Sequence, residues 1–212
     1  MANANRPNGF IPVTNFTGDA WNGQATRYSI AASYATALYI GDPVATSGTS
    51  DAFGIQGIAI GGTTGALRGV IIGLYNSGST TGVPGGVSVG NIGNPNISYR
   101  PAADPNVWYA DVVDDPTTIF MIQEHANGTQ LTAAECGLNT IGYNGTAGNG
   151  YLSGWQLAST TDATAAQTAT LQLRLLGLAQ FPGGINVFGA NAKWLVKINV
   201  HELGAGTGAA GV

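Results

Sequence analysis

The sequence has few charged residues. Asp, Glu, Lys and Arg make up 8% of its 212 residues, against about 25% in a typical globular domain. The seven Lys and Arg residues are scattered singly, whereas a nucleic-acid-binding surface clusters them to contact phosphates. We therefore expect no nucleic-acid partner. A net charge of −4 also gives weak repulsion between molecules, which favours a surface that is covered in an assembly.

Cysteine and long apolar runs are also scarce. Cys136 is the single cysteine, so no disulfide can form within the chain, and we expect synthesis in a reducing compartment. The N-terminus shows no basic stretch followed by an apolar run, and no segment reaches the ~18 apolar residues of a membrane helix. The sequence thus predicts neither a recognisable secretion signal nor a membrane partner.

The strongest periodic pattern lies between residues 168 and 203. Apolar and polar residues alternate twice there, with one apolar set of Ala169, Leu171, Leu173 and Leu175 and a second of Trp194, Val196, Ile198 and Val200. A period of two is typical of half-buried strands. We predict two neighbouring antiparallel strands in an all-β barrel or sandwich, with Arg174, Lys193 and Lys197 on their polar faces.

Other segments read as short strands separated by turns. They cover residues 26–31, 37–40, 44–46, 55–60, 66–75, 107–113, 117–124 and 151–157. Asp114, Asp115 and Pro116 have turn chemistry and predict a hairpin between the strands at 107–113 and 117–124. Thr132 and Glu135 match a capping box and predict one short helix, ended by Gly137. Residues 76–95 and 142–150 are predicted to be glycine-rich loops.

The chain divides into four predicted parts. Residues 1–20 form an extended N-terminal arm, 21–103 an N-terminal β domain, 104–203 a C-terminal β domain and 204–212 a flexible tail. The boundary follows a change in composition at residues 101–105. The arm is predicted to contact a capsid or a neighbouring subunit through Pro7, Phe10, Ile11 and Phe16, although a frayed terminus is the alternative.

The candidate reactive residues do not form a recognised motif. Residues 206–211 fit the GxGxxG pattern, but no helix can follow them within this sequence. Asp104, Asp111, Asp114 and Asp115 lie close in sequence, yet they lack the regular spacing of a calcium loop and suit turns. His125, His201 and Cys136 are isolated, and we interpret them as structural. We therefore predict no catalytic, cofactor or metal site and no enzymatic activity.

Several segments resemble tailed-bacteriophage virion proteins. They are residues 109–116 (YADVVDDP), 118–123 (TIFMIQ) and 189–199 (GANAKWLVKIN) with the glycine-rich tail, together with the opening at 1–5 (MANAN) and 7–10 (PNGF). The chain is similar to the phage head decoration, or cement, proteins. The resemblance covers the first dozen residues and about the last hundred, and no match is found for residues 54–96.

The resemblance implies a β-rich protein on the outer surface of an icosahedral phage head, made in the host cytoplasm. Such proteins clamp neighbouring major capsid subunits together, here as a homotrimer or a dimer, without a cofactor. One alternative is a phage tail or head-fibre module whose aromatic residues bind host glycans, with Trp108, Tyr109, Tyr151 and Trp155 as candidates. Another is a carbohydrate-active enzyme with an Asp/Glu pair.

Overall fold

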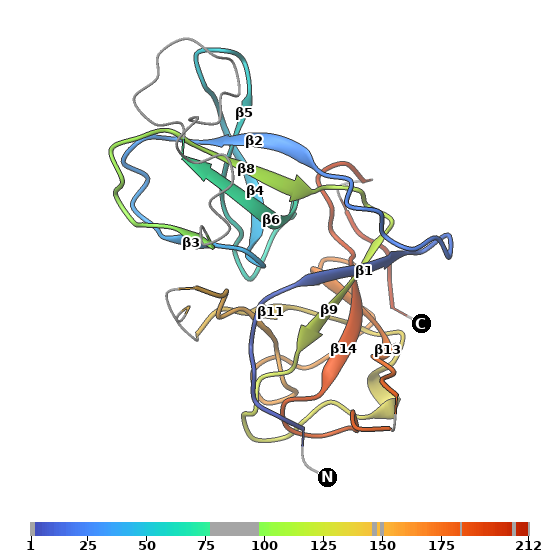
Figure 1. Ribbon diagram of the computed structural model, residues 1–212. Coiled ribbons are helices and arrows are strands. Elements are labelled where there is room, and N and C mark those ends of the chain that lie inside the picture. The colour runs from blue at the N-terminus through green and yellow to red at the C-terminus, as the bar shows by residue number, and fades with distance from the viewer. Residues whose placement is uncertain are drawn as a thin grey trace.

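The computed structural model describes residues 3–76, 98–145, 148, 151–182, 184–204 and 207–211. These residues form strands, turns and one short 3-10 helix, so the prediction of an all-β fold is confirmed. A closed barrel lies at one end of the molecule and an open sheet at the other (Figure 1). No helix in the described part is long and apolar enough to span a membrane.

Five strands close the barrel in the order β2-β5-β4-β6-β8. They are β2 (Thr26–Ile30), β4 (Pro43–Ser50), β5 (Gln56–Ile60), β6 (Gly69–Asn76) and β8 (Trp108–Val113). Closure gives every strand two neighbours, which removes free edges. Tyr28, Ile30, Val44, Ile71 and Val112 are among the buried side chains that fill the interior.

The open sheet has the antiparallel order β1-β9-β14-β13-β10. Its strands are β1 (Ile11–Asn15), β9 (Thr118–Gln123), β10 (Asn139–Thr140), β13 (Leu173–Leu178) and β14 (Lys193–Ile198). Two short pairs complete the fold. They are β3 (Leu38–Tyr39) with β7 (Tyr99–Arg100), and β11 (Gly142–Tyr143) with β12 (Gln156–Leu157).

The predicted pairing of the last two long strands is confirmed, although the first of them begins at Leu173 and not at residue 168. β13 and β14 are antiparallel neighbours, with Leu173 opposite Ile198 and Leu175 opposite Val196. The four side chains are buried, as their alternation requires. They belong to a core that also contains Leu67, Val70 and Val113 from the barrel side, so the sheet and the barrel are packed together.

The predicted hairpin at residues 107–124 is wrong. β8 pairs with β2 and β6 inside the barrel, whereas β9 pairs with β1 and β14 in the open sheet. The chain therefore passes from barrel to sheet at residues 114–117, and the predicted boundary at 101–105 falls within the barrel part. The physical reason is that β2 and β6 already pair with the two edges of β8, so no edge of β8 is left to accept β9.

Both ends of the chain pack onto the open sheet. Residues 11–15 form β1 instead of an arm that extends away from the molecule. Near the other end, the Ala209 carbonyl accepts hydrogen bonds from Arg174 and Asn139, and the Gly211 N–H donates to the Gln167 carbonyl. These bonds hold the described part of the segment predicted to be a flexible tail.

The predicted capping box is present, but it starts a shorter element than expected. The Thr132 hydroxyl accepts from the Ala134 N–H, and the Glu135 carboxylate accepts from the Thr132 N–H. Only a 3-10 turn follows at Ala133–Glu135, because Cys136 is already extended. Residues 77–97, most of 146–150 and residues 205–206 lie outside the described part, and with them most of the predicted glycine-rich loops and part of the GxGxxG string.

Candidate interaction surface

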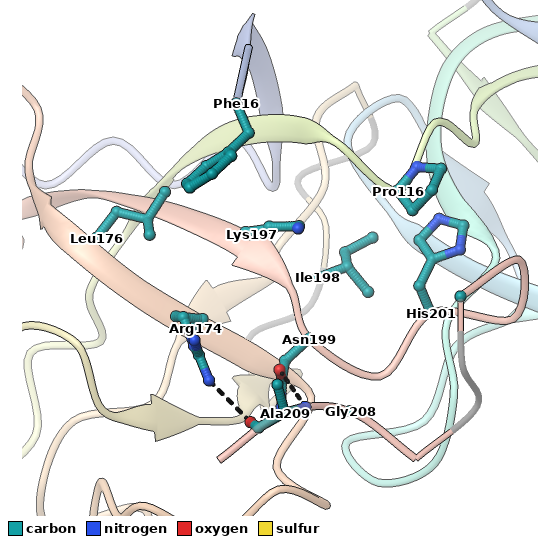
Figure 2. Close-up of a pocket in the computed structure, with 11 residues that line it drawn as sticks. Phe16, Pro116, Arg174, Leu176, Lys197, Ile198, Asn199, His201, Gly208 and Ala209 are labelled. Carbon is teal, nitrogen blue, oxygen red and sulfur yellow. Dashed lines mark hydrogen bonds between the residues drawn. The ribbon is translucent and has the colours of Figure 1, made fainter. Parts of the chain in front are cut away.

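The end of β1 places an aromatic side chain beside a groove on the open sheet. Phe16 follows β1 directly and is 65% exposed. The groove beside it has a volume of about 290 Å³ and lies over β13 and β14 (Figure 2). Its apolar lining includes Phe16, Pro116, Leu176 and Ile198, and its polar lining includes Arg174, Lys197, Asn199 and His201.

The groove contains two cationic side chains with different surroundings. The Lys197 ammonium lies 5.3 Å from the centre of the Phe16 ring, a cation–π contact. The Arg174 guanidinium donates from Nε to Asn139 Oδ1 at 3.1 Å and from Nη2 to the carbonyls of Ala209 and Ala210. Arg174 therefore also holds the C-terminal segment that forms one wall of the groove.

His201 lines the end of the groove near Pro116 (Figure 2) and is only 3% exposed. Its Nδ1 accepts the Leu203 N–H at 3.0 Å, which assigns the ring proton to Nε2. Nε2 has no hydrogen-bond partner among the described residues. Burial lowers the pKa of His201 to about 4, and the charge of Arg68 adds to the effect. The imidazole is therefore neutral at pH 7 and adds no charge to the groove.

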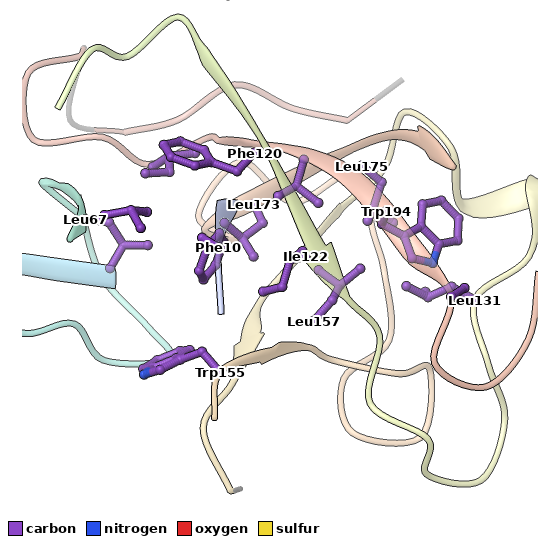
Figure 3. Close-up of a cluster of buried hydrophobic side chains, with 14 of the residues drawn as sticks. Phe10, Leu67, Phe120, Ile122, Leu131, Trp155, Leu157, Leu173, Leu175 and Trp194 are labelled. Atoms are coloured by element: carbon purple, nitrogen blue, oxygen red, sulfur yellow. The ribbon is translucent and has the colours of Figure 1, made fainter. Parts of the chain in front are cut away.

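The four residues predicted to make intersubunit contacts differ in their surroundings. Phe10 is 2% exposed and packs edge-on against Phe120 in the core shared by sheet and barrel, with ring centres 6.1 Å apart (Figure 3). Pro7 and Ile11 are half-buried, and Phe16 is exposed. Phe10 thus fills a pocket of its own chain, which leaves Phe16 as the aromatic side chain of this segment that a partner can reach.

Hydrogen bonds fix the segment before β1 in place. The Arg6 N–H donates to Gln123 Oε1 at 2.8 Å, and the Phe10 N–H donates to the Gly41 carbonyl at 2.9 Å. Asn3 exchanges hydrogen bonds with Val187 at 2.8 and 3.1 Å. The N-terminal segment is thereby held along the open sheet, and Phe16 is presented from a fixed backbone.

A second group of exposed apolar side chains lies between β13 and β14. Ile185, Val187 and Phe188 are exposed there, and Phe188 also contacts the buried Trp194 ring. These residues were not singled out from the sequence. Their apolar character within a loop was the available signal.

The clustered carboxylates stabilise the barrel and the turn that leaves it. Asp111 pairs with Arg27 at 2.9 Å, and Asp114 accepts from the Tyr28 hydroxyl at 2.6 Å. Asp115 accepts from the Thr117 N–H at 2.7 Å, which shapes the crossing to β9. Asp104 accepts from the Asn106 N–H, and this bond lowers the pKa of the Asp104 carboxyl. No three His, Cys, Asp or Glu side chains of the described residues are grouped to hold a metal ion.

His125 takes part in a polar cluster with a superficial likeness to a catalytic triad. Its Nδ1 lies 2.8 Å from Asp162 Oδ2, and its ring stacks on Tyr143 with centres 3.9 Å apart. The Ser159 hydroxyl bonds to the same carboxylate oxygen at 2.8 Å. In a catalytic triad the hydroxyl is hydrogen-bonded to the imidazole and not to the carboxylate. We therefore interpret this cluster as one that holds together the turns near Asn127 and Asp162. Cys136 is half-buried, and burial raises the pKa of its thiol.

The candidate glycan-binding aromatics are mostly part of the core. Trp108, Tyr109 and Trp155 are buried, whereas Tyr151 is 67% exposed. Aromatic rings in strands bury large apolar areas, which explains why three of the four face inward. Only Tyr151 remains accessible as a stacking surface.

Comparison of the chain with protein-family models, with curated proteins and with solved structures found no match. The fold itself defines the class as an all-β protein, in which a closed five-stranded barrel packs against an open five-stranded antiparallel sheet.

Proposed function

We propose that this chain is a non-enzymatic structural protein of a tailed-bacteriophage virion. In this proposal it decorates the outer surface of the head and clamps neighbouring major capsid subunits, as a homotrimer or a dimer, after synthesis in the host cytoplasm. The resemblance of residues 109–116, 118–123 and 189–199 to virion proteins supports the class. The exposed Phe16 side chain beside the groove supplies an apolar surface for such contacts.

The observation that carries the proposal is the rigid presentation of Phe16. Its backbone follows a strand that is paired with β9, while Phe10 secures the same segment in the core. Little conformational entropy is lost when such a side chain binds, because its backbone is already ordered. Full burial of one Phe side chain contributes about 1.5–3 kcal/mol.

Contacts of this size become effective when they are repeated. A symmetric oligomer that engages several capsid subunits at once gains avidity from the high effective concentration of its second and third sites. Binding to the assembled lattice and not to free subunits then stabilises the particle by mass action. A modest surface on each protomer is therefore sufficient for the proposed role.

A phage tail or head-fibre module that binds host glycans is the second candidate. The exposure of Tyr151 favours it, because an accessible ring can stack on a sugar face. The support is restricted to this residue, since the other three aromatic candidates are in the core.

The test is cosedimentation with empty heads of the encoding phage that lack this protein. We expect the wild-type protein to pellet with the heads and Phe16→Ala to bind about tenfold more weakly, the equivalent of about 1.4 kcal/mol. Phe53→Ala is the matched control, because Phe53 is also exposed, at 49%, but lies in a barrel loop. Failure of the folded wild-type protein to bind heads would overturn the proposal, and selective glycan binding lost in Tyr151→Ala would replace it with the second candidate.

A further inference from the structure

Two cationic residues of the groove face each other across neighbouring strands. Arg174 on β13 and Lys197 on β14 are direct partners in the register of the sheet. Like charges directly opposite each other destabilise a strand pair. A carboxylate beside them would offset this repulsion, so the pair is an unusual choice for a surface whose only role is to stay hydrated.

The described residues provide no such carboxylate. The ion pairs formed elsewhere are Arg27–Asp111, Arg68–Asp114 and His125–Asp162. Within the described part, Lys197 contacts the Phe16 ring and forms no ion pair, while Arg174 donates to backbone carbonyls and to an amide. The groove lining likewise contains no Asp or Glu. It is a positive site in a chain whose net charge is −4.

Asp114 and Asp115 act electrostatically on His201 at the end of the groove, and both carboxylates are already hydrogen-bonded within the chain. Asp114 accepts from the hydroxyls of Thr26 and Tyr28, and Asp115 accepts from Thr117. Asp114 also pairs with Arg68, and neither carboxylate forms an ion pair with Lys197 in the described part of the chain. The positive charge of the groove is left for an external group.

We infer that this groove binds a carboxylate group of a partner protein, with an adjacent apolar side chain packed against Phe16 and Leu176. The inference rests on the proposed function, in which the partner is the major capsid protein, and it adds the chemistry of the contact. The Lys197 ammonium pairs with the carboxylate, and the apolar wall excludes water from one side of that pair, which strengthens it.

A carboxylate fits the groove better than a nucleic-acid phosphate. Nε and Nη2 of Arg174 are occupied by oxygen atoms of the chain itself, so Arg174 cannot make the two-pronged contact that it could offer to either a carboxylate or a phosphate. Lys197 is then the one cation free to pair within the described lining, whereas nucleic-acid sites combine many. The lining beside Lys197 also includes the apolar residues Phe16, Pro116 and Leu176, which match an apolar amino-acid side chain next to the charge.

The isolated protein can be tested with a small probe. We expect N-acetyl-L-leucine, which joins a carboxylate to an apolar side chain, to shift the NMR signals of Lys197, Leu176 and the Phe16 ring in a saturable way. N-acetyl-L-leucine amide is the neutral match and should shift them little. Lys197→Gln should weaken the binding of N-acetyl-L-leucine about tenfold. Lys193→Gln, which lies on the same face of β14, should leave this affinity unchanged.

Two results from this titration would overturn the inference. One is equal binding of the acid and the amide, which would show that charge is not recognised. The other is tighter binding of inorganic phosphate or of a short oligonucleotide than of the acid, which would indicate a nucleic-acid site. A folding control accompanies both, and we expect the Tm of Lys197→Gln to stay within about 2 °C of the wild type.

Binding to empty heads separates this inference from the function on which it rests. We expect wild-type binding to weaken as NaCl rises from about 50 mM to about 500 mM, because salt screens a partly exposed pair, and Lys197→Gln to bind weakly at both concentrations. If the wild type and Lys197→Gln bind heads equally at all salt concentrations, the carboxylate contact is refuted and the decoration role is unaffected. Loss of head binding by the wild type, with the N-acetyl-L-leucine site intact, would refute the decoration role alone.

Discussion

Replacing Phe10 by Ala should strongly destabilise the protein. Phe10 is almost fully buried between the sheet and the barrel and packs edge-on against Phe120. Loss of its transfer free energy costs about 1.5–3 kcal/mol, and the cavity left behind brings the total to about 3–5 kcal/mol. For a chain of this length each kcal/mol lowers Tm by about 2–4 °C, so Tm should fall by roughly 6–20 °C.

Urea unfolding followed by tryptophan fluorescence measures this loss, because Trp155 and Trp194 belong to the same core. Phe53→Ala is the matched control and should change the free energy of unfolding by less than about 0.5 kcal/mol. Deletion of residues 1–13 should be at least as damaging as Phe10→Ala, since it also removes part of β1. Equal midpoints for Phe10→Ala and Phe53→Ala, or a deletion that unfolds like the wild type, would show that the segment is a detachable arm after all.

Two further predictions concern backbone geometry and pH. Gly9 and Gly23 both have positive φ, but a Cβ on Gly9 would overlap the Gly41 carbonyl oxygen, whereas a Cβ on Gly23 meets nothing within 4 Å. Gly9→Ala should therefore lower the free energy of unfolding, measured in urea, by about 1–3 kcal/mol more than Gly23→Ala does. Equal losses for the two variants would contradict the close packing at Gly9. The folded-state pKa of His201 is lowered from 6.5 to about 4, so its stability contribution is complete above pH 6.5 and is lost as pH falls through 4. His201→Asn keeps an acceptor for the Leu203 N–H. The difference in urea midpoint between this variant and the wild type should thus be smaller at pH 4 than at pH 7. A difference that stays the same at both pH values would refute the lowered pKa of His201.

The alternation of apolar residues was sufficient to predict part of the fold. Leu173 and Leu175 on one strand and Val196 and Ile198 on the next have one buried face each, and the alternation indicates strands and shows which side chains face the core. The link at residues 114–117 was misinterpreted because turn chemistry reports a local change of direction only. Whether the next strand folds back or crosses to another sheet depends on distant partners, here β2 and β6 for β8.

The candidate site was only partly accessible to sequence reasoning. Phe10 and Phe16 are equivalent as spaced aromatic anchors, and only the fold shows that the first fills a pocket of its own chain while the second is exposed. Arg174 and Lys197 were correctly assigned to polar faces. Their direct opposition, however, depends on the register of β13 against β14, which residue patterns alone did not specify.

The placement of β1 has a consequence for the order in which the molecule is assembled on the ribosome. The barrel is built from residues 26–113, so it can close as soon as that stretch has emerged. β1 is synthesised first, but it pairs with β9, which gains its second neighbour only when β14 at residues 193–198 is complete. The pair of β1 and β9 therefore gains its support only after residues 193–198 have been made, and loop closure over this distance should make formation of the open sheet the slow step of folding.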